Sequence, residues 1–121
     1  MVERKNVLKE KSIAFALRVV NAYKFLTKEK NEFVLSKQLL RCGTAIGALV
    51  REAEYAQSVL DFISKMSIAL KETNETEYWI TLLKESEYID EDVYSSILND
   101  CQELLKLLIS SINTSKKKLK K

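Results

Sequence analysis

Residues Leu35–Leu83 read LSKQLLRCGTAIGALVREAEYAQSVLDFISKMSIALKETNETEYWITLL, and this stretch carries the most regular apolar pattern in the chain. Apolar or small residues recur in it at alternating steps of three and four, which places them on one face of a helix. The positions are Leu39, Cys42, Ile46, Leu49, Ala53 and Ala56, then Phe62, Met66, Ala69, Thr73, Thr76, Ile80 and Leu83. Two such faces separated by a short break predict neighbouring antiparallel helices that pack at a shallow angle.

Further helical patterns flank this stretch on both sides. One apolar stripe runs from about Asn6 to Lys28, and another begins after Asp90. The chain contains no proline, two glycines and no run that reads as a strand. We therefore predict an all-α fold, an antiparallel up-down-up-down four-helix bundle. We expect one domain at residues 1–115 and a basic disordered tail at residues 116–121.

Three polar residues are expected to cap helix starts. Ser36, Ser58 and Asp90 each precede an apolar periodic run and have the short side chains that accept a hydrogen bond from the first-turn backbone. Asp61 stands three residues after Ser58, where it can return a hydrogen bond and favour the positive helix terminus.

The composition argues against most catalytic chemistry. The 121-residue chain has no histidine, so it lacks the usual neutral-pH proton shuttle and the Glu-x-x-His pairs of di-metal bundles. Cys42 and Cys101 fall on core-facing positions, where a thiol behaves as a small apolar side chain. We expect no enzymatic activity, no metal and no cofactor. No apolar run is long enough to span a membrane, and no signal peptide is apparent, so we expect a soluble cytoplasmic protein.

Basic residues gather at the two ends of the chain. The net charge is +3, but five lysines lie in the last six residues, so residues 1–115 carry +3 − 5 = −2. In an up-down-up-down bundle both termini lie at the same end. A basic end that attracts nucleic acid is therefore one reading of these residues, and a merely solvated tail is the other. The candidate nucleic-acid-binding residues are Arg4, Lys5, Lys9, Lys11, Lys116, Lys117, Lys118, Lys120 and Lys121.

Structural roles are expected for the remaining polar and small residues of the central stretch. Gly43 and Gly47 lie one turn apart inside a helix, which indicates close approach of another helix. Glu72 or Glu75 is expected to pair with Arg41 or Arg51. We expect Trp79 to lie at a subunit interface, because aromatic residues at helical spacing more often fill a core or an interface than stack on a base.

The segments SKQLLRCGTAIGALVREA and QSVLDFISKMSIALKETNETEYWITLL resemble the bacterial four helix bundle protein family, whose founding members are encoded within intervening sequences of 23S rRNA genes. The accessory variability determinant of diversity-generating retroelements is a more distant relative. The family pattern is met at Gln38, Leu39, Arg41, Ile46, Glu52, Ser58, Asp61, Phe62, Ile68, Ala69, Glu75 and Trp79. The chain departs from it at Cys42, Ala45, Leu49 and Ala53, where the family often has serine, serine, asparagine and glycine.

The resemblance implies an antiparallel four-helix bundle that assembles into a barrel-like homopentamer. For the retroelement relative it implies a scaffold that binds nucleic acid and a reverse transcriptase. We therefore expect a non-enzymatic oligomeric scaffold that binds nucleic acid, RNA more than DNA, through phosphate contacts. The alternative is a protein–protein assembly module with no nucleic-acid role, which the mildly acidic body favours.

Overall fold

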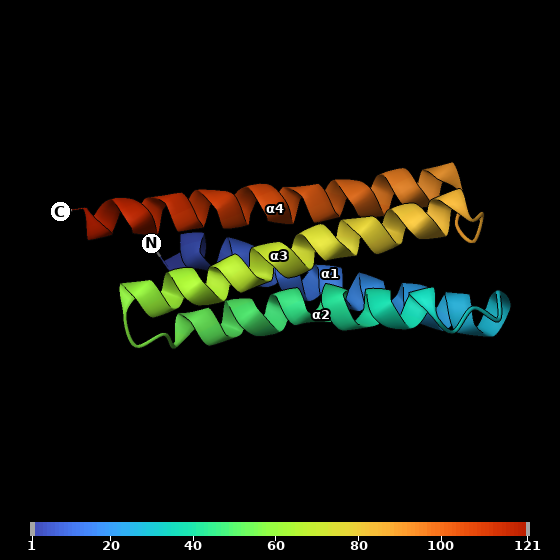
Figure 1. Cartoon of the computed structure of the whole chain (residues 1–121), viewed down its shortest axis with the longest axis horizontal. Helices are drawn as coiled ribbons and strands as arrows, with labels where there is room; N and C mark the ends of the chain where they lie inside the picture. The colour runs from blue at the N-terminus through green and yellow to red at the C-terminus, as the bar shows by residue number, and fades with distance from the viewer. Residues whose placement is uncertain (1, 121) are drawn as a thin grey trace.

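The chain folds into four antiparallel helices joined by short connections (Figure 1). They are α1 (Val2–Glu29), α2 (Leu35–Glu54), α3 (Val59–Glu85) and α4 (Glu91–Leu119). The structure is a computed structural model that describes residues 2–120, with side chains from Val7 onward. No strand occurs in this part of the chain, so the predicted all-α, up-down-up-down architecture is confirmed.

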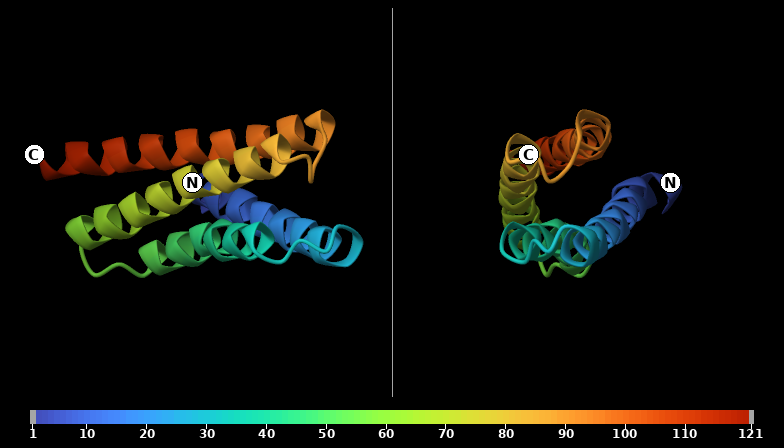
Figure 2. Two further views of the ribbon diagram at one scale, coloured as in Figure 1. Left: turned by 45° about the vertical axis from the view of Figure 1, so that its right-hand side comes forward. Right: turned by 90° about the vertical axis from the view of Figure 1, so that its right-hand side faces the viewer.

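The four helices form an open bundle with α2 and α3 at its centre. α2 packs against α3 most extensively, α1 packs mainly against α2, and α4 packs mainly against α3. α1 and α4 contact each other much less. The end-on view in Figure 2 shows them diverging toward the N-terminus of α1. One long edge of the bundle is therefore less closely packed than the others.

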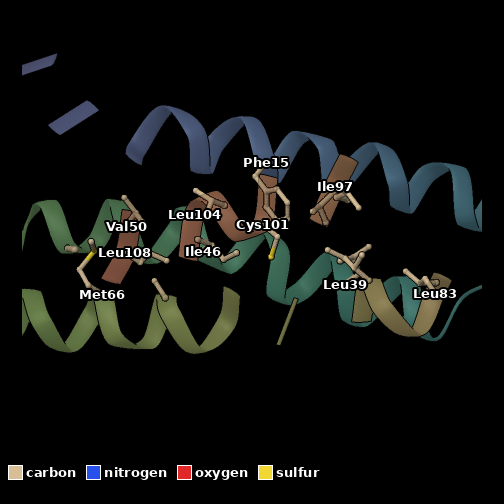
Figure 3. Packing of buried hydrophobic residues seen from close by; sticks show 14 of the residues in the cluster. Phe15, Leu39, Ile46, Val50, Met66, Leu83, Ile97, Cys101, Leu104 and Leu108 are labelled. Atoms are coloured by element: carbon tan, nitrogen blue, oxygen red, sulfur yellow. The ribbon is translucent and has the colours of Figure 1, made fainter. Parts of the chain in front are cut away.

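The core lies along the apolar faces predicted from the sequence (Figure 3). Leu39 and Ile46 of α2 and Met66, Ile80 and Leu83 of α3 are at most 2% exposed. α1 adds Phe15, Val19 and Leu26 to this core, and α4 adds Ile97, Cys101, Leu104, Leu108 and Ile112. The two threonines on the α3 face are also buried. The Oγ1 of Thr73 donates to the carbonyl of Ala69 at 2.7 Å, so burial leaves this hydroxyl satisfied.

The last helix is longer than expected, because it continues into residues 116–121, where the sequence predicted a disordered tail. α4 continues without interruption through Leu119. Lysine is a good helix former, and its charge is favourable near the C-terminal end of the helix dipole. Ser115 is buried at 7% exposure, so packing supports the helix up to the start of the lysine run.

Two of the three predicted helix caps are present. The Oγ of Ser58 accepts a hydrogen bond from the backbone of Asp61 at 3.0 Å, and Oδ1 of Asp90 accepts one from the backbone of Val93 at 2.8 Å. The Asp61 carboxylate also accepts a hydrogen bond from the backbone of Gln57 at 3.1 Å.

The prediction that Ser36 caps α2 is wrong, because Ser36 lies inside the helix. The cap is supplied by Glu32, whose carboxylate accepts hydrogen bonds from the backbone N–H groups of Val34, Leu35 and Ser36 at 3.1, 2.9 and 2.7 Å. The hydroxyl of Ser36 instead donates to the carbonyl of Glu32 at 2.7 Å. The start of α2 is thus fixed by a buried glutamate in the preceding connection.

Within residues 2–120, none of the helices has the length and apolarity needed to cross a membrane.

Candidate nucleic-acid interface

Four lysines lie at the C-terminal end of α4, three of them on its last turn and one at its C-cap. We call Lys116, Lys117, Lys118 and Lys120 the C-terminal lysine cluster. All four are exposed, and no carboxylate among the described side chains forms an ion pair with them. The end of α4 that carries them extends beyond the ends of the other helices (Figure 1). The cluster is therefore accessible to a polyanion.

The basic residues predicted on α1 are less available than those of the cluster. Lys9 forms an ion pair with Glu54 of α2 at 3.4 Å, and Lys11 forms one with Glu103 of α4 at 3.1 Å. The N-terminus of α1 and the C-terminus of α4 lie at the same end of the molecule, as predicted, but the end-on view shows them apart (Figures 1 and 2). The side chains of the other predicted positions, Arg4, Lys5 and Lys121, lie outside the described residues.

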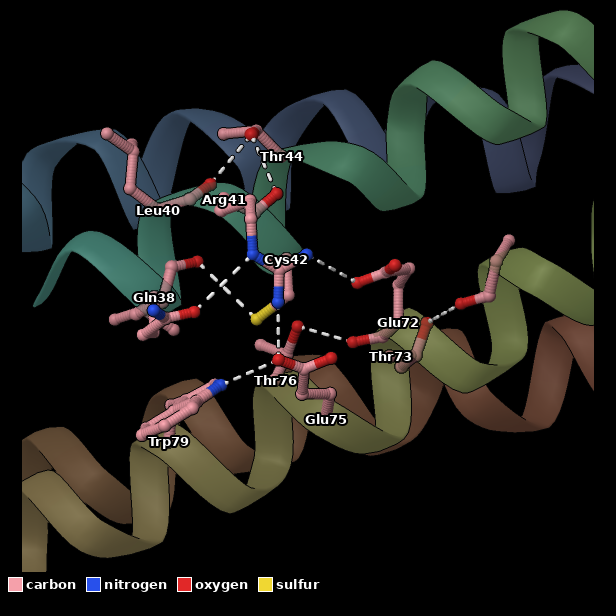
Figure 4. A network of polar contacts seen from close by, with 12 residues as sticks. Gln38, Leu40, Arg41, Cys42, Thr44, Glu72, Thr73, Glu75, Thr76 and Trp79 are labelled. Atoms are coloured by element: carbon pink, nitrogen blue, oxygen red, sulfur yellow. Dashed lines mark hydrogen bonds and ion pairs between the residues drawn. The ribbon is translucent and has the colours of Figure 1, made fainter. Parts of the chain in front are cut away.

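A polar network links α2 to α3 on the outside of the bundle (Figure 4). The Arg41 guanidinium pairs with Glu72 at 3.4 Å and with Glu75. Its Nε donates to Oε1 of Gln38 at 3.4 Å, and Nε1 of Trp79 donates to Glu75 at 3.0 Å. The predicted pairing of Arg41 with these glutamates is confirmed. Because the Arg41 side chain is 51% exposed, we assign the network mainly to helix register.

The other residues of the family pattern have separate roles. Phe62 packs against the core, and Asp61 helps to cap α3. Glu52 is exposed, and Arg51 is exposed at the edge of a shallow groove between α1 and α2. Trp79 is half-buried against the core of its own chain and meets Tyr78 edge-on, with ring centroids 5.0 Å apart. Its expected place at a subunit interface stays a prediction.

The two glycines of α2 face α1, as their spacing predicted. A methyl group added at Gly43 would lie 2.8 Å from a side-chain carbon of Val19. At Gly47 the added carbon would be 3.5 Å from the backbone oxygen of Ser12. Gly43 is thus required for the close approach of α1, whereas Gly47 leaves room for a methyl group.

Both thiols are buried, as predicted. Burial raises the pKa of Cys42, and burial together with the nearby Glu77 charge raises that of Cys101 to about 12. Neutral, inaccessible thiols of this kind are poor nucleophiles. In the described part of the chain, no cluster of three or more cysteine or acidic side chains could hold a metal.

One contact between α1 and α4 was missed by the sequence reasoning. Arg18 of α1 pairs with Asp100 at 2.7 Å and donates to the hydroxyl of Ser96 at 2.8 Å. Arg18 also lines a groove of about 720 Å³ that includes Phe25 and Val93. Residues 82 positions apart in the chain form this pair, so no local pattern could have indicated it.

Comparison with known proteins gives consistent matches. Residues 4–110 match the family model described as 23S rRNA-intervening sequence protein. A solved structure of a protein of unknown function from the S23 ribosomal protein family of Bacteroides thetaiotaomicron is 61% identical in sequence. The match between the two covers 90% of this chain and 97% of the solved chain, with a TM-score of 0.89. No curated protein matches the chain.

Proposed function

The chain belongs to the 23S rRNA-intervening sequence protein family. We propose that it is a non-enzymatic, homo-oligomeric helical scaffold that binds nucleic acid, RNA more than DNA. The observation that carries the proposal is the C-terminal lysine cluster. Its lysines stand on the last turn of α4 and at its C-cap, whereas Lys9 and Lys11 are each paired with a carboxylate. An oligomer would present several such clusters together, which raises the local positive potential.

The chemistry of the cluster favours contacts to phosphate. Lysine ammonium groups bind phosphate oxygens as point charges and release condensed counterions, without reading base edges. We therefore propose binding that tolerates sequence and depends steeply on salt. The proposed RNA partner and the free thiols fit a cytoplasmic protein.

The surface of the single chain supports self-association. Fourteen large apolar side chains are exposed on the described residues. Among them, Ile13 and Leu17 of α1 are 47% and 60% exposed and border the groove between α1 and α2. Neighbouring exposed apolar side chains at a groove, such as these two, suit contact with a partner or with another copy of the chain. The family resemblance makes a pentamer the proposed assembly.

Replacing all four cluster lysines by glutamine is expected to weaken RNA binding at least tenfold near physiological salt. Loss of four phosphate contacts should also lower the slope of log K against log salt by about 3, at roughly 0.7 per contact for a single strand. The measurement is fluorescence anisotropy with a labelled mixed-sequence RNA across a salt series. The matched control replaces the exposed lysines Lys24, Lys28, Lys37 and Lys71 by glutamine, with the same change in net charge.

The two variants separate the proposed function from its alternative. If the control weakens binding as much as the cluster variant does, only net charge matters and the cluster is not the site. If the wild-type protein does not bind RNA at physiological salt, the nucleic-acid role is wrong. The alternative of a protein–protein assembly module then replaces it.

Leu17→Glu is expected to reduce the oligomer to smaller species, because a carboxylate cannot be buried cheaply in an apolar interface. Native mass spectrometry at micromolar concentration should give five copies for the wild-type protein and mainly monomer for the variant. Lys24→Glu, at another exposed position of α1, is the control and should keep the wild-type assembly. A monomeric wild-type protein would contradict the scaffold proposal. If the Leu17→Glu variant keeps the wild-type oligomer, Leu17 does not lie in the subunit interface.

A further inference from the structure

Helix α4 is divided into an acidic half and a basic half. The acidic half, Glu91–Glu103, contains four carboxylates and no cation. The basic half, from Leu104 to Leu119 together with the C-cap Lys120, contains five lysines and no carboxylate. One rigid helix therefore changes sign of charge near its middle.

The acidic half is largely neutralised within the molecule. Asp100 pairs with Arg18 at 2.7 Å, and Glu103 pairs with Lys11 at 3.1 Å. In the described part of the chain no carboxylate pairs with a lysine of the basic half. The unbalanced positive charge of α4 is thus confined to its C-terminal half.

Within the basic half, polar residues line up along the solvent-facing side. Steps of four, three, four and three place five exposed residues on one face, opposite the buried Leu104, Leu108 and Ser115. These five residues are Lys106, Ser110, Asn113, Lys117 and Lys120, and we call them the α4 stripe. Lys116 and Lys118 flank it on either side. The stripe is about 21 Å long at 1.5 Å per residue.

Each member of the stripe can donate a hydrogen bond to a phosphate oxygen. Lysine supplies ammonium donors, serine a hydroxyl and asparagine an amide. The opposite face of α4 packs on the bundle as far as Ser115, which holds Lys106, Ser110 and Asn113 in line, and the same helix continues through Lys117. A strand that lies along it therefore meets donors that the packed part of the helix already holds in place, which lowers the entropic cost of binding.

We propose that the sugar-phosphate backbone of an extended RNA strand lies along the α4 stripe, from Lys106 to Lys120, and that Glu103 marks the end of the contact. This inference rests on the proposed nucleic-acid function and specifies its site. It adds Lys106, Ser110 and Asn113 to the C-terminal lysine cluster. It also makes the alignment of the donors, and not only the lysine count, a determinant of affinity.

The first test places a negative charge at the middle of the stripe. Ser110→Glu should weaken binding of a labelled mixed-sequence RNA at least fivefold, and Ser110→Lys should strengthen it. Asn74→Glu, at an exposed position of α3, changes the net charge equally and should change affinity less than twofold. Circular dichroism checks that each variant keeps its helical content.

The second test moves one lysine without changing composition. Lys106→Asn combined with Asn99→Lys transfers the charge two turns back, into the acidic half, on the same exposed face of α4. We expect weaker binding and a salt slope lower by about 0.7. Unchanged affinity would show that total charge, and not its place on the stripe, controls binding.

The outcomes distinguish this inference from the proposed function. If Ser110→Glu binds as Asn74→Glu does while the cluster variant loses binding, the stripe is wrong and the cluster remains the site. If the wild-type protein binds no RNA, both are wrong. If it binds phosphatidylserine vesicles instead, the surface recognises lipid phosphate, and that result also overturns both.

Discussion

Glu32→Ala is expected to lower the free energy of unfolding by about 2 to 4 kcal/mol, because it removes three charge-assisted hydrogen bonds at the start of α2. Glu32 is 7% exposed, and Ser36, whose backbone nitrogen lies 2.7 Å from the Glu32 carboxylate, is fully buried. Without the carboxylate, the buried N–H of Ser36 loses its hydrogen-bond partner. Glu32→Gln keeps one acceptor oxygen and should lose less.

The contribution of Glu32 should depend on pH in a defined direction. Burial alone would raise the pKa of this carboxyl, but hydrogen bonds from Leu35, Ser36 and Val34 outweigh it and hold the pKa below the ordinary value of 4.5. A pKa lowered in the folded state adds stability that is complete above the unfolded pKa and is lost as pH falls through the folded one. The difference between wild type and Glu32→Ala should thus be full at neutral pH and shrink below about pH 4.5.

Urea denaturation followed by circular dichroism, at pH 7 and at steps down to pH 3, gives the required free energies. Glu29→Ala removes the same charge from an exposed position at the end of α1 and is the control. It should change stability by less than about 0.5 kcal/mol. If the two variants are equally stable at pH 7, Glu32 is not the cap of α2.

The sequence predicted the helices and the core well because apolar spacing depends only on local chain geometry. The break at residues 55–58 and the caps at Ser58 and Asp90 follow from the same local rules. The capping role of Glu32 was not predicted, because glutamate is not one of the short side chains that usually cap helices. It reaches the helix only because the chain turns at Asn31, where φ is 53°.

The candidate site was predicted only in part, for a different physical reason. The exposed lysines could be named from the sequence, but their availability depends on which carboxylates lie nearby in the fold. Lys9 meets Glu54 and Lys11 meets Glu103 across helix interfaces. Residues 116–119 continue the helix past the buried Ser115, and a serine gives no apolar signal in the sequence that would indicate this packing.

Gly43→Ala and Gly47→Ala are expected to change stability in opposite directions, although the two residues lie one turn apart on the same helix. Each replacement gains about 1 kcal/mol of helix propensity. At Gly43 the new methyl group would meet both γ carbons of Val19, at 2.8 and 3.0 Å, and its β carbon at 3.3 Å. Val19 is fully buried and its branched side chain has little rotamer freedom, so α1 itself must shift.

We expect Gly43→Ala to lose up to about 2 kcal/mol net, since overpacking of this kind costs about 1 to 3 kcal/mol and the propensity gain offsets about 1 kcal/mol of it. Gly47→Ala should gain about 0.5 to 1 kcal/mol, because its methyl group would make ordinary contacts with Ser12 at 3.5 to 3.6 Å. Urea denaturation of both variants gives the comparison, and each is the control for the other. Equal effects would mean that α1 does not approach α2 as closely at Gly43 as the structure shows.

A double-mutant cycle identifies the cause of the Gly43 effect. Val19→Ala alone should destabilise the protein, because it removes buried methyl groups from the core. Combined with Gly43→Ala, it should cost less than the sum of the two single changes, since the added methyl group occupies space that the valine vacates. Additive effects would instead assign the loss at Gly43 to something other than its contact with α1.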